Sequence, residues 1–180
     1  MKILKTILIA VAVIIAVVLI TALFVKKDYA VEREVIINKP KEQVYDYVKY
    51  LKNQNNFSKW AQMDPVMHKE FRGTDGTVGF VSAWSSDSSD VGKGEQEIKK
   101  IVPGERIDYE IRFIEPFASV APAHITFEAP SAGETKVKWG FEGHMPYPMN
   151  IMQLFMNMEE MIGGDLQIGL NNLKNILEKQ

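Results

Sequence analysis

Three side chains are candidates for moving protons: Glu159, His124 and Tyr109. Glu159 lies between Phe155 and Ile162 in a stretch with helical apolar spacing, which predicts a carboxylate within an apolar helix face. A buried carboxylate needs a partner or a proton, so Glu159 is a candidate polar anchor or general acid. Alternatively it lies near the helix start and reaches solvent or pairs with a basic residue. His124 is a candidate pocket-lining polar group on a predicted strand, and the alternative for it is a surface or hydrogen-bonded structural role.

Aromatic residues on the predicted strands are candidates for ligand contact. Because side chains alternate between the two faces of a strand, Trp139 and Phe141 share one face, and Tyr109 shares a face with Phe113. Together with Trp84 on an earlier strand, these rings suit stacking on a planar or lipid-like ligand. The alternative interpretation is that each ring belongs to the ordinary hydrophobic core.

Methionines cluster near the C-terminal part of the chain. Five of the nine lie within thirteen positions: Met149, Met152, Met156, Met158 and Met161. Flexible thioethers suit a surface that adapts to varied apolar shapes, such as a cavity entrance, so Met152 and Phe155 are predicted ligand contacts. Two alternatives remain: the methionines fill an irregular core, or they touch a membrane.

The residue types do not indicate metal or cofactor chemistry. The chain has no cysteine, and its three histidines, His68, His124 and His144, lack metal-ligand spacing on a single element. We therefore predict no metal site and no cofactor. The glycine-rich stretch 73–79 lacks the lysine and following helix of a phosphate loop.

An apolar stretch near the N-terminus predicts a membrane segment. Residues 7–25, from Ile7 to Val25, carry no charge and would form a helix of roughly 28 Å, about the hydrocarbon thickness of a bilayer. We expect residues 1–27 to be a transmembrane anchor and 28–180 a ligand-binding domain on the extracytoplasmic side, as in a signal anchor. A cleaved signal peptide and a buried core helix are the alternatives.

The charge balance separates these two parts. Four of the 21 basic residues and none of the 23 acidic ones lie in the first 27 positions, so the remaining body is acidic. An acidic body provides no positive field for phosphates, and nucleic acid is not expected as a partner.

The pattern after the apolar stretch predicts an α+β domain. Alternation over 29–37 indicates a first strand, and two short helices follow, the first with Asn38 as its cap and Pro40 in its first turn. Six further strands are expected at 66–72, 78–85, 93–102, 106–114, 123–129 and 135–145. Polar turns between them favour an antiparallel meander of about seven strands.

The C-terminal part predicts one long amphipathic helix that begins near Pro148. Its apolar residues recur at helical intervals: Met152, Phe155, Ile162, Leu166, Leu170, Leu173 and Leu177. A curved antiparallel sheet cannot fill its own concave face, so this helix must lie across it, and a pocket can persist between them.

Several short motifs, in this order, resemble one superfamily. They read VIINKPKEQVY at 35–45, GFVSAW at 79–84, IVPGERI at 101–107, TKVKW at 135–139, and GD followed by GLNNLK between 164 and 174. Over residues 29–179 the chain resembles the SRPBCC superfamily, which includes START lipid-binding domains, birch-pollen-allergen-like proteins and polyketide cyclases. The resemblance implies a helix-grip fold with a cavity for an apolar ligand.

Three functional hypotheses follow. The first is a membrane-tethered, non-enzymatic domain that binds a small apolar molecule or a lipid between its sheet and long helix. The second is a polyketide-cyclase-like enzyme in which Glu159, His124 or Tyr109 moves protons on a bound carbonyl compound. The third is a cavity-free interaction module whose acidic surface docks another protein, with no particular protein partner predicted.

Overall fold

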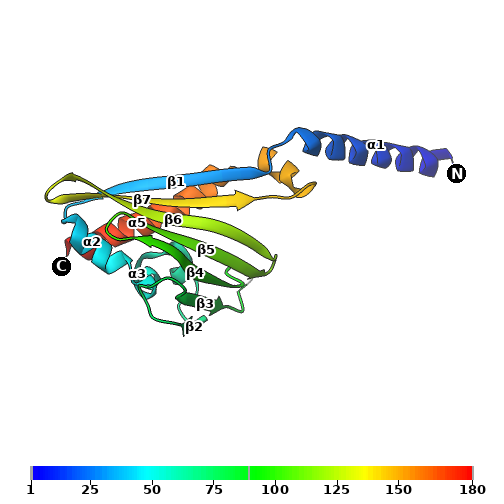
Figure 1. Ribbon diagram of the computed structural model, residues 1–180. Helices are drawn as coiled ribbons and strands as arrows, with labels where there is room; N and C mark the ends of the chain where they lie inside the picture. Colours follow the sequence, from blue (N-terminus) through cyan, green and yellow to red (C-terminus); the bar gives the residue numbers. More distant parts are fainter. Residues whose placement is uncertain (1, 89, 180) are drawn as a thin grey trace. The chain divides into compact units, whose positions relative to one another are not determined.

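The computed structural model describes residues 2–88 and 90–179 and divides them into two compact units (Figure 1). We call residues 2–29 with 144–158 the N-terminal unit. We call residues 30–143 with 159–179 the sheet unit. The two units are described separately below.

The N-terminal unit is built on helix α1 (Lys2–Phe24). Apart from two lysines and two threonines its side chains are apolar, and most are exposed; Ala22 is its buried residue. α1 is long and apolar enough to cross a membrane, a property that a signal sequence would share. Residues 149–154 of the same unit form the 3-10 helix η2 (Met149–Leu154).

The sheet unit contains a seven-stranded sheet in the order β1-β7-β6-β5-β4-β3-β2. Neighbours from β2 to β7 pair antiparallel, and β1 lies beside β7. The strands are β1 (Asp28–Ile37), β2 (His68–Arg72), β3 (Val81–Ser85), β4 (Lys93–Val102), β5 (Arg106–Glu115), β6 (Ser119–Ser131) and β7 (Glu134–His144). The predicted antiparallel meander is confirmed.

Two strands begin three or more residues away from the predicted start. β3 begins at Val81 because Gly79 just before it has φ +88°, which lies outside the extended region. β6 begins at Ser119, four residues earlier than expected, because Ser119 pairs with Phe113 at the far end of β5.

Short helices follow the first strand, as predicted. They are α2 (Lys41–Val48), the 3-10 turn η1 (Leu51–Asn53), α3 (Gln54–Phe57) and α4 (Lys59–Met63). Val44 and Val48, four positions apart on α2, are both buried, which is the spacing that predicted this helix. Phe57 of α3 is almost fully buried, whereas α4 has no buried residue.

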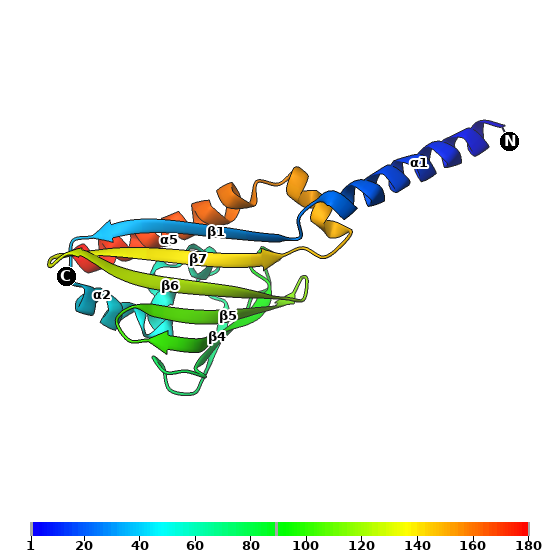
Figure 2. The ribbon, with the colours of Figure 1, turned by 45° about the horizontal axis from the view of Figure 1, so that its top comes forward.

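The long C-terminal helix is shorter than predicted. α5 spans Met158–Glu178 and runs along one face of the sheet, whereas we expected a helix from Pro148 (Figures 1 and 2). Asn157 precedes its first residue, and asparagine is a favoured residue at helix N-caps. The segment before Asn157 does not continue the helix but packs on α1, where the Asn150 side chain donates hydrogen bonds to the end of that helix.

The sheet has two different faces. The face covered by α5, which we call the helix face, packs on the buried leucines of that helix, Leu166, Leu170, Leu173 and Leu177. The opposite face, which we call the outer face, carries charged side chains.

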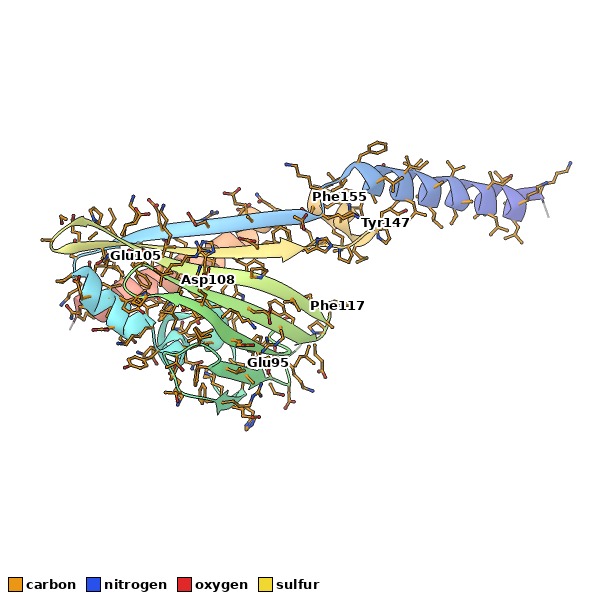
Figure 3. The ribbon with its side chains drawn as sticks, viewed as in Figure 1. Glu95, Glu105, Asp108, Phe117, Tyr147 and Phe155 are labelled. Carbon is orange, nitrogen blue, oxygen red and sulfur yellow. The ribbon has the colours of Figure 1, made fainter. Side chains whose placement is uncertain are left out.

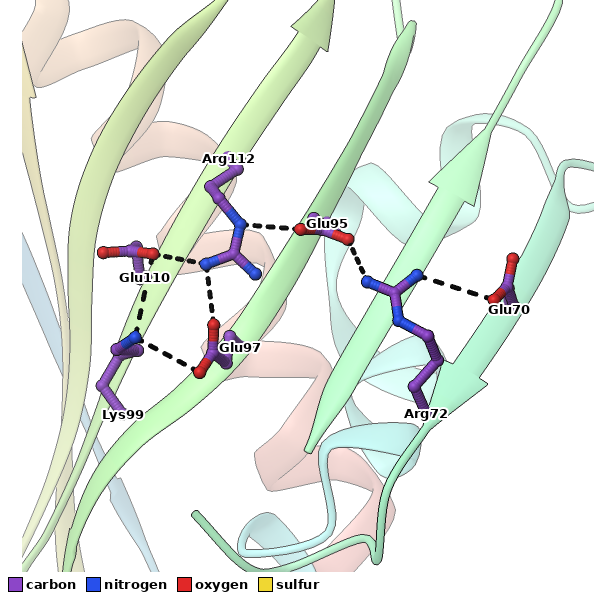
Figure 4. Close-up of polar contacts among 7 residues, drawn as sticks. All are labelled: Glu70, Arg72, Glu95, Glu97, Lys99, Glu110 and Arg112. Carbon is purple, nitrogen blue, oxygen red and sulfur yellow. Dashed lines mark hydrogen bonds and ion pairs between the residues drawn. The ribbon is translucent and has the colours of Figure 1, made fainter. Parts of the chain in front are cut away.

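An ion network occupies the outer face of β2, β4 and β5 (Figure 4). Arg112 donates to Glu95 and Glu97 at 2.7 Å each and also to Glu110. Arg72 joins Glu95 to Glu70. With Lys99 beside Glu97 and Glu110, these seven residues form what we call the outer-face network.

Candidate ligand-binding face

Strand register places most of the predicted aromatic contacts on the helix face. Trp139 packs against Gly169 of α5 so closely that a Cβ on Gly169 would lie 2.8 Å from the indole ring. Directly paired residues in antiparallel strands point to the same side. Phe141 pairs with Ala123, and Ala123 pairs with Tyr109. Phe141 lies two residues after Trp139 on β7, so all three share the face of Trp139.

The part of the helix face around Trp139 is filled by protein. The ring centroids of Phe57 and Trp60 lie 5.7 and 6.2 Å from that of Trp139, both edge-on. Ile107 and Ile125 beside it are fully buried. Trp139 is therefore a core residue, which agrees with the alternative interpretation of the aromatic pattern.

Tyr109 is also buried on the same face, with 3% of its surface exposed. Burial raises the pKa of its phenol well above the ordinary value, since ionisation would place a charge in an apolar environment. The side chain therefore stays neutral at physiological pH. It can serve as a hydrogen-bond donor, but it is unsuited to act as a general base.

The helix face is less completely filled at β3, β4 and the far end of β5. Five half-buried residues meet there, which we call the Trp84 cluster: Ser82, Trp84, Gln96, Ile111 and Phe113. Cross-strand pairing joins Ser82 to Gln96, Gln96 to Ile111, and Trp84 through Gly94 to Phe113. The cluster is a partly exposed apolar surface with a few polar groups.

Trp84 is held in a fixed orientation within this cluster. Its ring lies over Gly94, where a Cβ would be 2.5 Å from the indole. Its Nε1 donates to the Val91 carbonyl at 3.3 Å, and Phe113 meets it edge-on with centroids 6.2 Å apart. Because the indole N–H already has a partner, the exposed part of the ring is available for apolar contact.

The sequence did not lead us to predict that Gln96 of the cluster pairs with Gln54. Gln96 Nε2 donates to Gln54 Oε1 of α3 at 3.1 Å, which joins the sheet to the helices at a half-buried position. The signal was present: Gln96 falls between Gly94 and Ile98 at period two, on the inward-facing positions of β4. A polar residue at such a position is the kind of group that orients a ligand.

The structure places His124 on the outer face, contrary to the prediction that it lines a pocket. His124 pairs with Asp108, while the next residues, Tyr109 and Ala123, pair on the helix face. Its ring covers Gly140, and Nε2 lies 3.3 Å from a carboxylate oxygen of Glu32. The predicted alternation of side chains along β6 is right, but His124 falls on the positions that point to the outer face.

Glu159 lies in the first turn of α5 and its side chain is 74% exposed. Arg33 of β1 donates Nη1 to Glu159 Oε1 at 3.3 Å and Nη2 to the Glu159 carbonyl at 2.9 Å. The expectation of a carboxylate in an apolar stripe is wrong because α5 begins at Met158, which leaves Phe155 outside the helix and puts Glu159 in its first turn. The alternative interpretation, a carboxylate near the helix start with a basic partner, is what the structure has.

Met152 and Phe155 do not lie on the long helix at all. Both belong to the N-terminal unit, Met152 in η2 and Phe155 just after it, and both are exposed. An open hollow of about 420 Å³ in this unit is lined by Gln153, Leu154, Phe155, Met156, Asn157 and Met158. It shares Phe155 with the predicted contacts and no residue with the Trp84 cluster.

Among residues 2–88 and 90–179, no three histidine or acidic side chains gather as a metal site would require. The candidate site is therefore an apolar surface with amide and hydroxyl groups.

The comparisons with known proteins agree with this architecture. A family model described as polyketide cyclase / dehydrase and lipid transport matches residues 29–178. The chain therefore belongs to this family, within the SRPBCC superfamily. No curated relative matches the chain at a significant level.

Solved structures at low sequence identity share the fold. A protein from Chromobacterium violaceum is 18% identical, with a TM-score of 0.58 over 83% of this chain and 96% of its own. Ara h 8.0201 is 16% identical, with 0.57 over 85% and 99%. Truncated norcoclaurine synthase from Thalictrum flavum is 9% identical, with 0.64 over 85% and 95%. These likenesses establish the helix-grip fold.

Proposed function

We propose that this protein is a membrane-tethered domain that binds a small hydrophobic or lipid-like molecule on the helix face of its sheet. The observation that carries the proposal is the Trp84 cluster: apolar and aromatic side chains that point toward the helix side yet remain half-exposed. Each methylene moved from water to such a surface contributes about 0.8 kcal/mol, so an acyl chain gains affinity from a few contacts. Gln96 and Ser82 provide a polar end.

The family supports the same proposal, since its description includes lipid transport. The enzyme hypothesis has less support from the site. Tyr109 and His124 point to opposite faces of the sheet, and Glu159 is an exposed ion-pair partner of Arg33. Proton transfer needs groups within hydrogen-bond reach of one substrate, which these three do not provide.

Photo-crosslinking of the full chain in lipid nanodiscs tests the proposal. A diazirine-bearing fatty acid should label peptides that contain the Trp84 cluster, and excess unlabelled fatty acid should abolish that labelling. Trp84→Ala should raise the concentration of unlabelled fatty acid needed for competition about five- to tenfold, since a ring contact contributes about 1 kcal/mol. Phe117→Ala, which removes an exposed ring from the β5–β6 turn, is the matched control.

Labelling confined to α1 and residues 144–158, or labelling that excess fatty acid does not reduce, contradicts a site on the helix face. Equal effects of the two variants would also contradict it.

A further inference from the structure

The segment between β7 and α5 has an unusual composition. No acidic, basic or histidine side chain occurs between His144 and Glu159. Several of its large apolar side chains are exposed, with Leu154 at 57% and Phe155 at 84%. The others are Tyr147, Met149 and Met152. A contiguous apolar surface of this kind marks an interaction site rather than a solvated loop.

Side-chain hydrogen bonds fix this segment to the C-terminal end of α1. Asn150 Nδ2 donates to the carbonyls of Ala22 and Val25, at 2.7 and 2.8 Å. Gln153 Nε2 donates to the carbonyls of Lys26 and Lys27, at 3.0 and 3.3 Å. The last carbonyls of a helix have no partner within the helix, so the Asn150 amide satisfies a carbonyl at the end of α1 that would otherwise be unpaired in an apolar environment.

These contacts set the depth of the segment relative to α1. The apolar stretch ends at Val25, and Lys26 and Lys27 follow at the level where charge meets water. From Ala22 to Val25 the helix rises only about 4.5 Å. Asn150 is thus held within one helical turn of the point where the span would leave the hydrocarbon layer.

The surface of α1 continues into the exposed surface of the segment. Phe24 at the end of α1 is as exposed as Phe155, and Figure 3 shows Phe155 and Tyr147 beside this end of the helix. Tyrosine, with an apolar ring and a polar hydroxyl, is enriched at membrane interfaces. The hollow lined by residues 153–158 adds two amide-bearing side chains among apolar ones.

We propose that residues 145–158 lie in the interfacial layer of the bilayer that α1 spans, with Met149, Leu154 and Phe155 in contact with lipid acyl chains. The occupant of this surface is lipid, because the surface is continuous with that of the span and lies at its interfacial end. The inference rests on α1 being retained in the membrane, as in the proposed function.

Depth-dependent fluorescence quenching tests the inference. The chain has no cysteine, so single-cysteine variants of the full chain carry one environment-sensitive NBD label each. The label at Phe155→Cys in liposomes should emit to the blue and be quenched more by lipids with a shallow nitroxide than by lipids with a deep one. Labels at Ile14→Cys, within α1, and Glu105→Cys, in the β4–β5 turn, are the references.

The Ile14 label should be quenched most by the deep nitroxide, and the Glu105 label by neither. If the Ile14 label is quenched and the Phe155 label is not, the interfacial position is wrong while the anchor stands. If neither is quenched, the anchor itself fails. A blue-shifted Phe155 label that no lipid quenches means that protein covers the surface, which overturns the inference.

A charge introduced into the segment provides a second test. Leu154→Asp should reduce the quenching of the Phe155 label by at least about twofold, because a carboxylate resists burial in the bilayer. Leu154→Ala, which is smaller but uncharged, should leave most of the quenching in place. Equal quenching in both variants contradicts a lipid contact at this position.

Discussion

Two adjacent glycines on α5 are equivalent in the sequence and different in the structure. A Cβ on Gly163 would lie 2.4 Å from Arg33 Nη2, whereas a Cβ on Gly164 would have nothing within 4 Å. Gly163 therefore permits the close approach of the Arg33 guanidinium, which donates to Glu159 one turn earlier. Gly164 has no such neighbour.

We predict opposite effects of alanine at these two positions. Gly164→Ala should raise the free energy of unfolding by about 0.5–1 kcal/mol, the usual gain for alanine over glycine within a helix. Gly163→Ala should be at least about 1 kcal/mol less stable than Gly164→Ala, since it displaces Arg33 from its hydrogen bonds. Urea unfolding of the full chain in nanodiscs measures both.

Tryptophan fluorescence suits this measurement because all three tryptophans, Trp60, Trp84 and Trp139, belong to the sheet unit. Equal stabilisation by the two substitutions would show that the hydrogen bonds from Arg33 to Glu159 contribute nothing to stability.

Among the elements, the sheet strands β2, β4 and β5 are joined by charges on their outer face. Hydrogen bonds from Arg72 and then Arg112 hold the pKa of Glu95 below its usual value, and Arg112 does the same for Glu97. A carboxyl whose pKa is lower in the folded than in the unfolded state stabilises the fold at pH values above its unfolded pKa, which is about 4.3. That stabilisation is lost as pH falls through the lower, folded pKa.

We predict that Arg112→Leu makes stability less dependent on pH below pH 5. At pH 7 the variant should be about 1–2 kcal/mol less stable, because three carboxylates lose their shared donor. The deficit should shrink as the pH falls toward about 3, where protonation removes the contribution from the wild type as well. Urea midpoints at several pH values measure this.

Lys93→Gln is the control, because its partner Glu115 lies at the exposed end of β5. The control should show the same pH dependence as the wild-type chain. A deficit for Arg112→Leu that is constant from pH 7 to pH 3 would contradict the proposed linkage.

For the whole molecule, the decisive question is whether α1 remains attached. We predict that the chain isolated from membranes retains α1, because residues 7–25 are longer than a typical signal-peptide core and have no convincing cleavage site after them. The intact mass should correspond to the chain from its first residues. A mass that begins between residues 20 and 30 would show cleavage.

Labelling of intact cells tests membrane sidedness. A membrane-impermeant maleimide should label Glu105→Cys in intact cells, since we expect residues 28–180 outside the cytoplasm. The cysteine-free parent chain provides the background. Labelling only after the cells are lysed would place Glu105 in the cytoplasm.

How much could be predicted differs between the fold and the site. The α+β class and the seven strands follow from local patterns, because period-two alternation and turn residues act within a few positions. The start of α5 was mispredicted although Asn157 and Glu160 have the spacing of a helix capping box. The apolar spacing through Met152 and Phe155 concealed that signal.

The site could be predicted only in part, for a physical reason. Alternation along one strand groups residues by face but does not say which face is covered. Trp84 and Tyr109 were correctly grouped as inward-facing aromatics, whereas His124, predicted to line a pocket, lies on the outer face. The sequence by itself determined the elements, the apolar N-terminal helix and the acidic body. Only the tertiary structure decided that Glu159 pairs with Arg33, that Gln96 meets Gln54, and that Asn150 caps α1. Those partners lie 126, 42 and 128 residues apart, beyond the reach of any local pattern.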